Sequence, residues 1–200
     1  MAACVVWLLA AGVGAAVLLN YEGAAHSTGK ASEHWPQATQ IELDRKKATL
    51  VMFSHPHCPY TRASIGELKR LLARCPERVA AHVLFLKPGD HSETWTHTGL
   101  WRTAAAIPGV DVQPDTNGTE ARQFGAKTSG CVLFYAPTGQ LLFKGGITAG
   151  RGHTGDNPGS GAIIALLHGR NPLVSETPVY GCSLVDQSQA SPEVTALSPK

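Results

Sequence analysis

Short apolar runs alternate with stretches of helical periodicity through the middle of the chain, which predicts strands covered by helices. Five apolar runs are expected to be strands: Ala48–Phe53, Ala81–Leu86, Val110–Val112, Cys131–Tyr135 and Gln140–Lys144. Four stretches are expected to be helices: Pro59–Ala73, Trp95–Ala106, Thr119–Phe124 and Ser160–His168. Ala136-Pro137-Thr138-Gly139 joins the last two strands and has Pro and Gly where a hairpin turn favours them. This order predicts an α/β domain.

The N-terminal apolar run differs from the others in length and in its lack of charge. Ala2–Leu19 holds 18 apolar or small residues, and no Asp, Glu, Lys or Arg occurs in the first 19 positions. A helix of that length spans about 27 Å, close to the thickness of a membrane's hydrocarbon core. A cleaved signal peptide is the alternative, with Gly23-Ala24-Ala25 as a cleavage site, although the usual basic n-region is missing. We expect residues 1–20 to form a single transmembrane anchor.

Two segments without apolar periodicity flank the predicted domain. Residues 21–43 are expected to be a linker, since their first part is rich in Ala, Ser, Gly, His and Gln. Residues 186–200 are expected to be a disordered tail. The part between them, residues 44–185, has the length of one compact domain.

Charge offers no indication of a nucleic-acid partner. The net charge is +2 with His neutral, and it comes from scattered Lys and Arg rather than from a basic run. No Lys or Arg precedes the apolar span, so the positive-inside rule does not define the orientation of the anchor.

The residues with the clearest chemistry lie where the first strand ends and a helix is expected to begin, at His55-Pro56-His57-Cys58-Pro59-Tyr60-Thr61. A thiol at a helix N-terminus meets unpaired N–H groups and the positive end of the helix dipole, which favour the thiolate. Pro59 is expected at the first helical position, where a missing N–H costs nothing. His57 could add positive charge or relay a proton. The alternative is that Cys58 only fills a tight turn.

This segment resembles the active-site turn of thioredoxin-fold proteins, and C-P-Y-T is similar to the C-P-Y-C of glutaredoxins with Thr61 in place of the second cysteine. A more detailed resemblance is to the RedB-like branch of membrane-anchored thioredoxin-fold proteins. The matching segments are His55-Pro56-His57-Cys58-Pro59-Tyr60-Thr61-Arg62-Ala63-Ser64, Thr128-Ser129-Gly130, Gly145-Gly146-Ile147-Thr148, Arg151-Gly152-His153, Gly155-Asp156-Asn157 and Gly181-Cys182-Ser183-Leu184. The resemblance covers about Ala48 to Gly169, with the last motif beyond it.

The resemblance implies a thioredoxin-like fold, with a central mixed sheet flanked by helices, behind the N-terminal anchor. It also implies thiol–disulfide chemistry on protein thiols or disulfides outside the cytoplasm, in the periplasm, with no cofactor. Three departures from the pattern stand out. Tyr60 replaces a second cysteine, Ser183 replaces a proline, and Ser129-Gly130 occupies the loop where thioredoxins carry a cis-proline.

In this interpretation Cys58 is the nucleophile, and Thr61 donates a hydrogen bond to its sulfur. Cys4 lies in the anchor, and Cys75 lies about 25 Å down the same predicted helix, too far for a disulfide. Cys131 opens an apolar strand and is expected to be a buried structural thiol. Cys182 follows Pro178 and Gly181, which permit a chain reversal, so it is the candidate resolving cysteine. The alternative for Cys182 is a free surface thiol.

Two other functions stay open at this point. Metal binding or delivery, for example of copper, would use Cys58 with donors such as His55, His57, His91, His97 and His153, although the chain has no tight cysteine pair. No residue is assigned as a metal ligand. A binding scaffold that has lost catalysis is the other alternative. The glycine-rich loop Gly145–Gly159 lacks the ending of a phosphate-binding loop and is expected to be a long turn near the active site.

Overall fold

Five strands form one mixed sheet in the order β3-β2-β1-β4-β5 in the computed structural model, which describes residues 4, 7–15 and 29–184. The strands are β1 (Ala48–Ser54), β2 (Val79–Lys87), β3 (Val110–Thr116), β4 (Cys131–Tyr135) and β5 (Leu141–Gly145). β2 is parallel to β1 and β3, whereas β4 is antiparallel to β1 and β5. Because β1 lies at the centre and is covered on both faces, its residues form a continuous apolar run.

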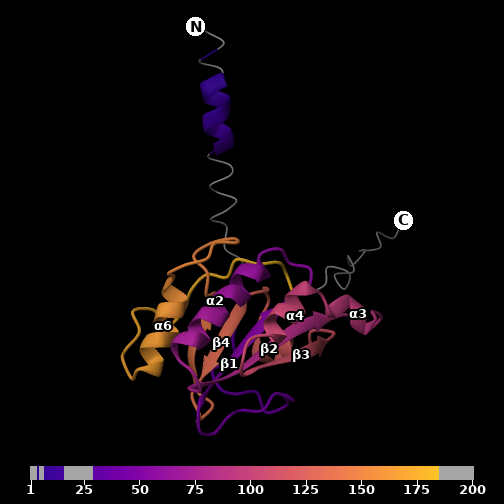
Figure 1. Cartoon of the computed structure of the whole chain (residues 1–200), viewed down its shortest axis with the longest axis vertical. Helices are drawn as coiled ribbons and strands as arrows, with labels where there is room; N and C mark the ends of the chain where they lie inside the picture. Colours follow the sequence, from indigo (N-terminus) through magenta and orange to yellow (C-terminus); the bar gives the residue numbers. More distant parts are fainter. Residues whose placement is uncertain (1–3, 5–6, 16–28, 185–200) are drawn as a thin grey trace, which may run out of the picture.

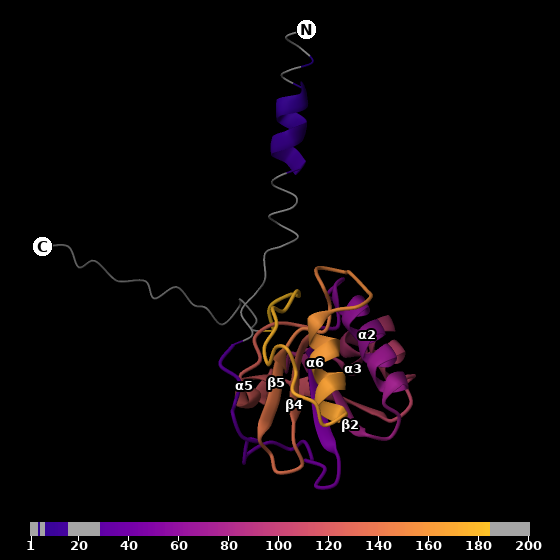
Figure 2. The same ribbon diagram turned by 90° about the vertical axis from the view of Figure 1, so that its left-hand side faces the viewer.

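Helices cover both faces of this sheet. They are α2 (Thr61–Arg74), α3 (Glu93–Thr96), α4 (Gly99–Ala105), α5 (Thr119–Phe124) and α6 (Pro158–Leu167). α2, α4 and α6 lie on one face (Figure 1), and α5 lies on the other (Figure 2). Alternate residues of β1 serve the two sides: Met52 packs in the cluster with Leu68 of α2 and Ile163 of α6, and Phe53 packs with Phe124 of α5.

The five predicted strands are confirmed in their order along the chain, and all but β4 have shifted ends. β3 extends to Thr116, four residues beyond the predicted end, because it pairs with β2 along Val110–Thr116. The structure tolerates Pro114 there because β3 is an edge strand. The single helix predicted at Trp95–Ala106 is wrong. Two short helices, α3 and α4, occupy that stretch, and α4 begins after Thr98, whose hydroxyl accepts the N–H of Leu100.

The described part of the expected linker, residues 29–43, packs against the domain. Trp35 makes edge-to-face contacts with Phe124 and Tyr135, each with ring centroids 5.1 Å apart. The Tyr135 hydroxyl donates to the Ser32 carbonyl at 2.9 Å. The packed part of the chain therefore begins before residue 44, and this segment covers the same sheet face as α5.

The expected anchor, residues 1–20, lies only partly within the described residues. Residues 7–15 are helical, and Trp7, Leu8, Leu9 and Val13 are exposed. Within the described parts of the chain, no helix combines the length and the apolar character needed to cross a membrane. The expected tail, residues 186–200, lies outside the described residues.

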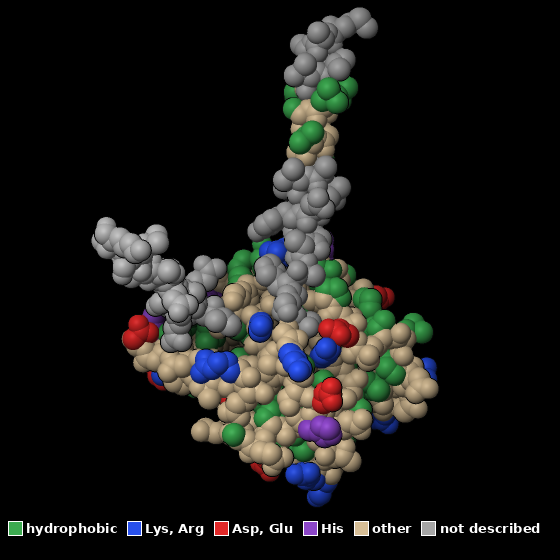
Figure 3. Space-filling view, turned by 180° about the vertical axis from the view of Figure 1, so that it is seen from behind, with side chains coloured by type: hydrophobic (Ala, Val, Ile, Leu, Met, Phe, Trp, Pro, Cys, Tyr) green, Lys and Arg blue, Asp and Glu red, His purple; other side chains and the backbone are tan. Residues whose placement is uncertain are grey.

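The face seen in Figure 3 carries Lys and Arg side chains interspersed with Asp and Glu. This distribution agrees with the scattered charges of the sequence.

Candidate functional site

Cys58 lies in the turn between β1 and α2. Its N–H donates to the His55 carbonyl at 3.1 Å, and its carbonyl accepts the N–H of Thr61 at 3.2 Å. The side chain is 1% exposed. α2 begins at Thr61 with Tyr60 as its N-cap, so the prediction that Pro59 takes the first helical position is wrong. The hydrogen-bonded turn from Cys58 to Thr61 delays the helix by two residues.

The side chain of Cys182 contacts that of Cys58. The two sulfur atoms are 2.7 Å apart, with the Cys182 thiol as donor, and the backbone N–H of Cys182 also points to the Cys58 sulfur at 3.3 Å. The segment that carries Cys182 runs beside the loop before β4. There the Ser129 N–H donates to the Cys182 carbonyl at 2.8 Å, and the Leu184 N–H donates to the Lys127 carbonyl at 2.9 Å.

The surroundings of the pair make Cys58, rather than Cys182, the cysteine that ionises first. Burial opposes ionisation of Cys58, but hydrogen bonds from the Cys182 thiol, the Thr61 hydroxyl and the backbone of Cys182 and Tyr60 lower its pKa below the ordinary value. Burial raises the pKa of Cys182, and its hydrogen bond to Cys58 and the charge on Cys58 raise it further. The structure therefore favours a Cys58 thiolate beside a Cys182 thiol that donates to it.

Thr61 and Ser129 supply a buried hydroxyl pair next to this thiolate. Their hydroxyl oxygens are 2.7 Å apart, and each residue is 1% exposed. Ser129 Oγ also accepts the N–H of His55 at 2.8 Å. The Ser129 hydroxyl can therefore donate to Thr61 and leave the Thr61 proton for the Cys58 sulfur. Ser129 was not among the predicted site residues, although its motif, T-S-G before the hairpin, was visible in the sequence.

The glycine-rich loop approaches the site from the side of Tyr60. The guanidinium carbon of Arg151 lies 5.3 Å from the centroid of the Tyr60 ring. The next residue, Gly152, also faces this ring, because a β-carbon built there would lie 4.0 Å from Tyr60 Cδ1. These contacts confirm the expected position of the loop near the active-site turn.

Histidines and one tryptophan form another side of the turn. His57 is exposed and donates from Nε2 to the Trp95 carbonyl at 3.0 Å. The Trp95 ring lies 4.7 Å from the His57 ring, 5.6 Å from the His55 ring and 4.9 Å from the His91 ring, measured between centroids. The hydrogen bonds that lower the Cys58 pKa come from other residues, not from His57, which sequence reasoning had offered as a source of positive charge.

The remaining cysteines lie apart from this pair. Cys75 is the C-cap of α2 and is 2% exposed. Cys131 is fully buried, as predicted, and burial raises its pKa to about 12. Cys4 is exposed. Among the described residues, no three His, Cys, Asp or Glu side chains are grouped so that they could hold a metal ion.

No protein-family model matches the chain, and no curated protein matches it. Among solved structures, it is similar to a hypothetical protein from Sinorhizobium meliloti 1021, at 16% identity and a TM-score of 0.57 over 81% of this chain and 94% of the other. An uncharacterized conserved protein from Geobacillus kaustophilus is similar at 19% identity and a TM-score of 0.57, over 82% and 93%. An exposed lipoprotein thioredoxin from Streptococcus pneumoniae matches at 14% identity and a TM-score of 0.44, over 70% and 99%.

These likenesses concern the fold alone. The sheet combines a β-α-β unit, β1-α2-β2, with a β-hairpin followed by α6, and β4 lies antiparallel beside β1. This is the thioredoxin-like arrangement that the resemblance implied. In it, the Cys58 turn follows the central strand, and the loop with Ser129 reaches the same end of the sheet.

Proposed function

We propose that this chain is a thiol–disulfide oxidoreductase in which Cys58 is the nucleophile and Cys182 is the resolving cysteine. The observation that carries this proposal is the contact between their sulfur atoms, 2.7 Å apart. A disulfide bond measures about 2.05 Å, so a small approach of the two sulfurs is enough to form one. The pKa order of the pair also fits, because the attacking sulfur must be the thiolate.

The reaction has two exchange steps. The Cys58 thiolate attacks one sulfur of a partner disulfide, a Cys58–partner disulfide forms, and the other partner sulfur leaves as a thiolate that takes up a proton. Cys182 then loses its proton to solvent and attacks the Cys58 sulfur. A Cys58–Cys182 disulfide forms and the second partner thiol is released. The partner gains two electrons from the cysteine pair and two protons from solvent, to which Cys182 releases one; the reverse steps oxidise a dithiol partner.

Thr61 and Ser129 stabilise the thiolate before the first step. A thiolate in a buried site depends on hydrogen-bond donors, and the Thr61 hydroxyl supplies one that Ser129 orients. Protein thiols or disulfides are the substrates that this site is proposed to accept.

We also propose that the protein belongs with the RedB-like branch, anchored by residues 1–20 with its domain in the periplasm. Support comes from three motif segments of that resemblance, which lie far apart in the sequence and meet at the site. They are the Cys58 turn, the Thr128-Ser129-Gly130 loop and the Gly181–Leu184 segment. An oxidising compartment would favour a disulfide between Cys58 and Cys182.

The reaction of the full chain with oxidised glutathione tests the proposed activity. We expect a glutathione adduct on Cys58 that is replaced by a Cys58–Cys182 disulfide, both identified by peptide mapping. Because hydrogen bonds lower the pKa of Cys58, the rate should reach half its maximum at a lower pH than the rate of a free thiol does. Cys58→Ser should abolish both products, and the exposed control Cys4→Ser should leave both unchanged. A folded wild-type protein that forms neither product would overturn the proposed activity.

Deletion of Met1–Asn20 tests the proposed anchor. The full chain should remain with membranes after a high-salt wash, and the truncated chain should be released, because its long apolar span is gone. Membrane fractionation followed by immunoblotting measures both. Membrane retention of the truncated chain would show that residues 1–20 are not the attachment.

A further inference from the structure

Building on the proposed function, we propose that Arg151 is a positioning residue for the resolving step, and that Glu67 holds the loop that carries it. Arg151 would favour Cys182 as a thiolate at the moment when it attacks the mixed disulfide on Cys58. The argument rests on where the loop between β5 and α6 lies, on what holds it there, and on the charge that it brings to the cysteine pair.

The loop brings a cation to the edge of the cysteine site. The Arg151 guanidinium stacks near the Tyr60 ring at 5.3 Å from its centroid, and Tyr60 is only two residues after Cys58. Arg151 is half-buried, so its charge is only partly screened by water. Burial, the hydrogen bond to Cys58 and the charge of the Cys58 thiolate raise the pKa of Cys182, and the charge of Arg151 lowers it.

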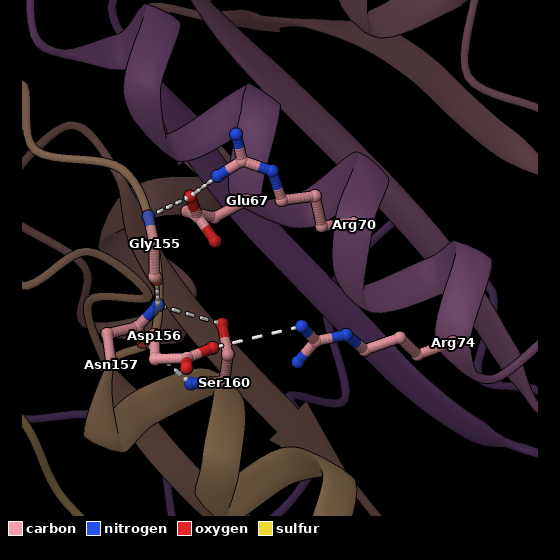
Figure 4. A network of polar contacts seen from close by, with 7 residues as sticks. All are labelled: Glu67, Arg70, Arg74, Gly155, Asp156, Asn157 and Ser160. Atoms are coloured by element: carbon pink, nitrogen blue, oxygen red, sulfur yellow. Dashed lines mark hydrogen bonds and ion pairs between the residues drawn. The ribbon is translucent and has the colours of Figure 1, made fainter.

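A buried carboxylate fixes the loop from α2. Glu67 is 4% exposed, and its carboxylate accepts the Gly155 N–H at 2.7 Å and the Arg70 guanidinium. Figure 4 shows both contacts converging on Glu67 between α2 and the loop. A hydrogen bond from a backbone N–H to a buried carboxylate is charge-assisted and stronger than a neutral one. Glu67 therefore ties the loop to the same helix that follows Cys58.

The end of the loop is fixed as well. Asn157 caps α6, with its side-chain oxygen accepting the Ser160 N–H at 2.8 Å. Figure 4 also shows an ion pair between Arg74 and Asp156, with 3.8 Å between the charged atoms, but Asp156 is almost fully exposed and this pair contributes little. Glu67 and the Asn157 cap therefore hold the loop at Gly155 and Asn157, and the contact with the Tyr60 ring places Arg151 beside the Cys58 turn.

The effect of Arg151 on the protonation of Cys182 differs between the two exchange steps. Before the first step, burial, the hydrogen bond to Cys58 and the charge on Cys58 keep Cys182 protonated, as a donor to the thiolate. In the mixed disulfide Cys58 is uncharged, because its sulfur is bonded to the partner. Arg151 is then left to favour the Cys182 thiolate, which attacks the Cys58 sulfur as the Cys58–partner bond breaks. The partner sulfur leaves with the electron pair and takes a proton from solvent.

The test follows both steps with oxidised glutathione, using acid quenching and mass spectrometry over a range of pH. Arg151→Met should leave formation of the Cys58 adduct close to wild type and slow glutathione release about tenfold near neutral pH. The midpoint of the release profile should rise by about one pH unit, the equivalent of that tenfold change. Arg151→Lys should restore most of the rate. Glu67→Leu should reproduce part of the defect, and Glu67→Gln, which keeps an acceptor for Gly155, should not.

A second measurement does not depend on turnover. In the Cys58→Ser background, the pH at which Cys182 alkylates at half its maximal rate should rise when Arg151 is replaced by Met. An unchanged release profile or an unchanged Cys182 profile in a folded Arg151→Met protein would overturn the proposal while leaving the proposed function intact. Slowing by the same factor at every pH, including the high-pH plateau where Cys182 is fully ionised, would indicate a purely structural role and would also overturn it. If wild-type Cys58 forms no adduct, the proposed function fails and this inference fails with it.

Discussion

Cys182→Ser is expected to trap a mixed disulfide on Cys58. The Cys182 thiol is the group in contact with the Cys58 sulfur, and serine cannot form a disulfide. Resolution would then depend on a thiol from solution, and loss of the adjacent nucleophile should slow it by more than about 10²-fold. Peptide mapping after mild oxidation should show glutathione on Cys58, or dimers linked through Cys58, where the wild-type protein shows the Cys58–Cys182 disulfide.

Cys182→Ala is the matched variant, because it removes the donor as well as the nucleophile. The serine hydroxyl can still donate to the Cys58 sulfur, but alanine cannot. Loss of this hydrogen bond should raise the pKa of Cys58, so less thiolate is present at neutral pH and the first step slows in Cys182→Ala more than in Cys182→Ser. Wild-type turnover in both variants would show that the protein works as a monothiol enzyme and that Cys182 is not its resolving cysteine.

The position of Cys58 could be predicted because the features that define it are close in sequence. An apolar run ends, a proline follows the cysteine, and an amphipathic helix begins, all between Ala48 and Arg74. The start of that helix could not be placed to the residue. The first residue of the helix depends on the hydrogen bond from the Thr61 N–H to the Cys58 carbonyl, and the hydrophobic periodicity of the sequence does not reveal that bond.

The contact of Cys182 with Cys58 joins two residues that are 124 positions apart in the sequence. Sequence reasoning reached Cys182 by excluding the other cysteines, and it could not supply the distance or the order of the two pKa values. The contact between the Thr61 and Ser129 hydroxyls also joins residues far apart in the sequence, 68 positions, and its distance could not be predicted either. Such sites arise where loops from separate elements meet at one end of a sheet.

Tertiary contacts of single side chains explain why the structure differs from the prediction at the expected linker and at the helix expected over Trp95–Ala106. Trp35 is a single aromatic residue in a polar segment, and only the structure shows that it packs on Phe124 and Tyr135. The break between α3 and α4 lies at Thr98, whose hydroxyl donates to the Pro56 carbonyl at 3.1 Å. That contact to the Cys58 turn is tertiary, so helical periodicity alone predicts one continuous helix.

Gly181→Ala is expected to separate Cys182 from Cys58 and to destabilise the domain. A β-carbon at Gly181 would lie 1.8 Å from the Ser129 carbonyl oxygen, far inside any allowed contact. Ser129 cannot retreat easily, because its hydroxyl is bonded to His55 and Thr61, and the next residue donates its N–H to the Phe53 carbonyl of β1 at 2.7 Å. The segment with Cys182 must therefore move instead.

The expected cost of this overpacking is about 1–3 kcal/mol in the free energy of unfolding. The effect on chemistry should be larger, since a shift of about 1 Å between reacting atoms slows a step on the order of 10²-fold. Gly161→Ala in α6 is the matched control: its β-carbon would meet nothing within 4 Å, and alanine should stabilise the helix by about 0.5–1 kcal/mol. Denaturant unfolding and the rate of Cys58–Cys182 disulfide formation measure the two effects. If Gly181→Ala forms the disulfide at the wild-type rate, the close approach of Gly181 to Ser129 does not hold Cys182 in place.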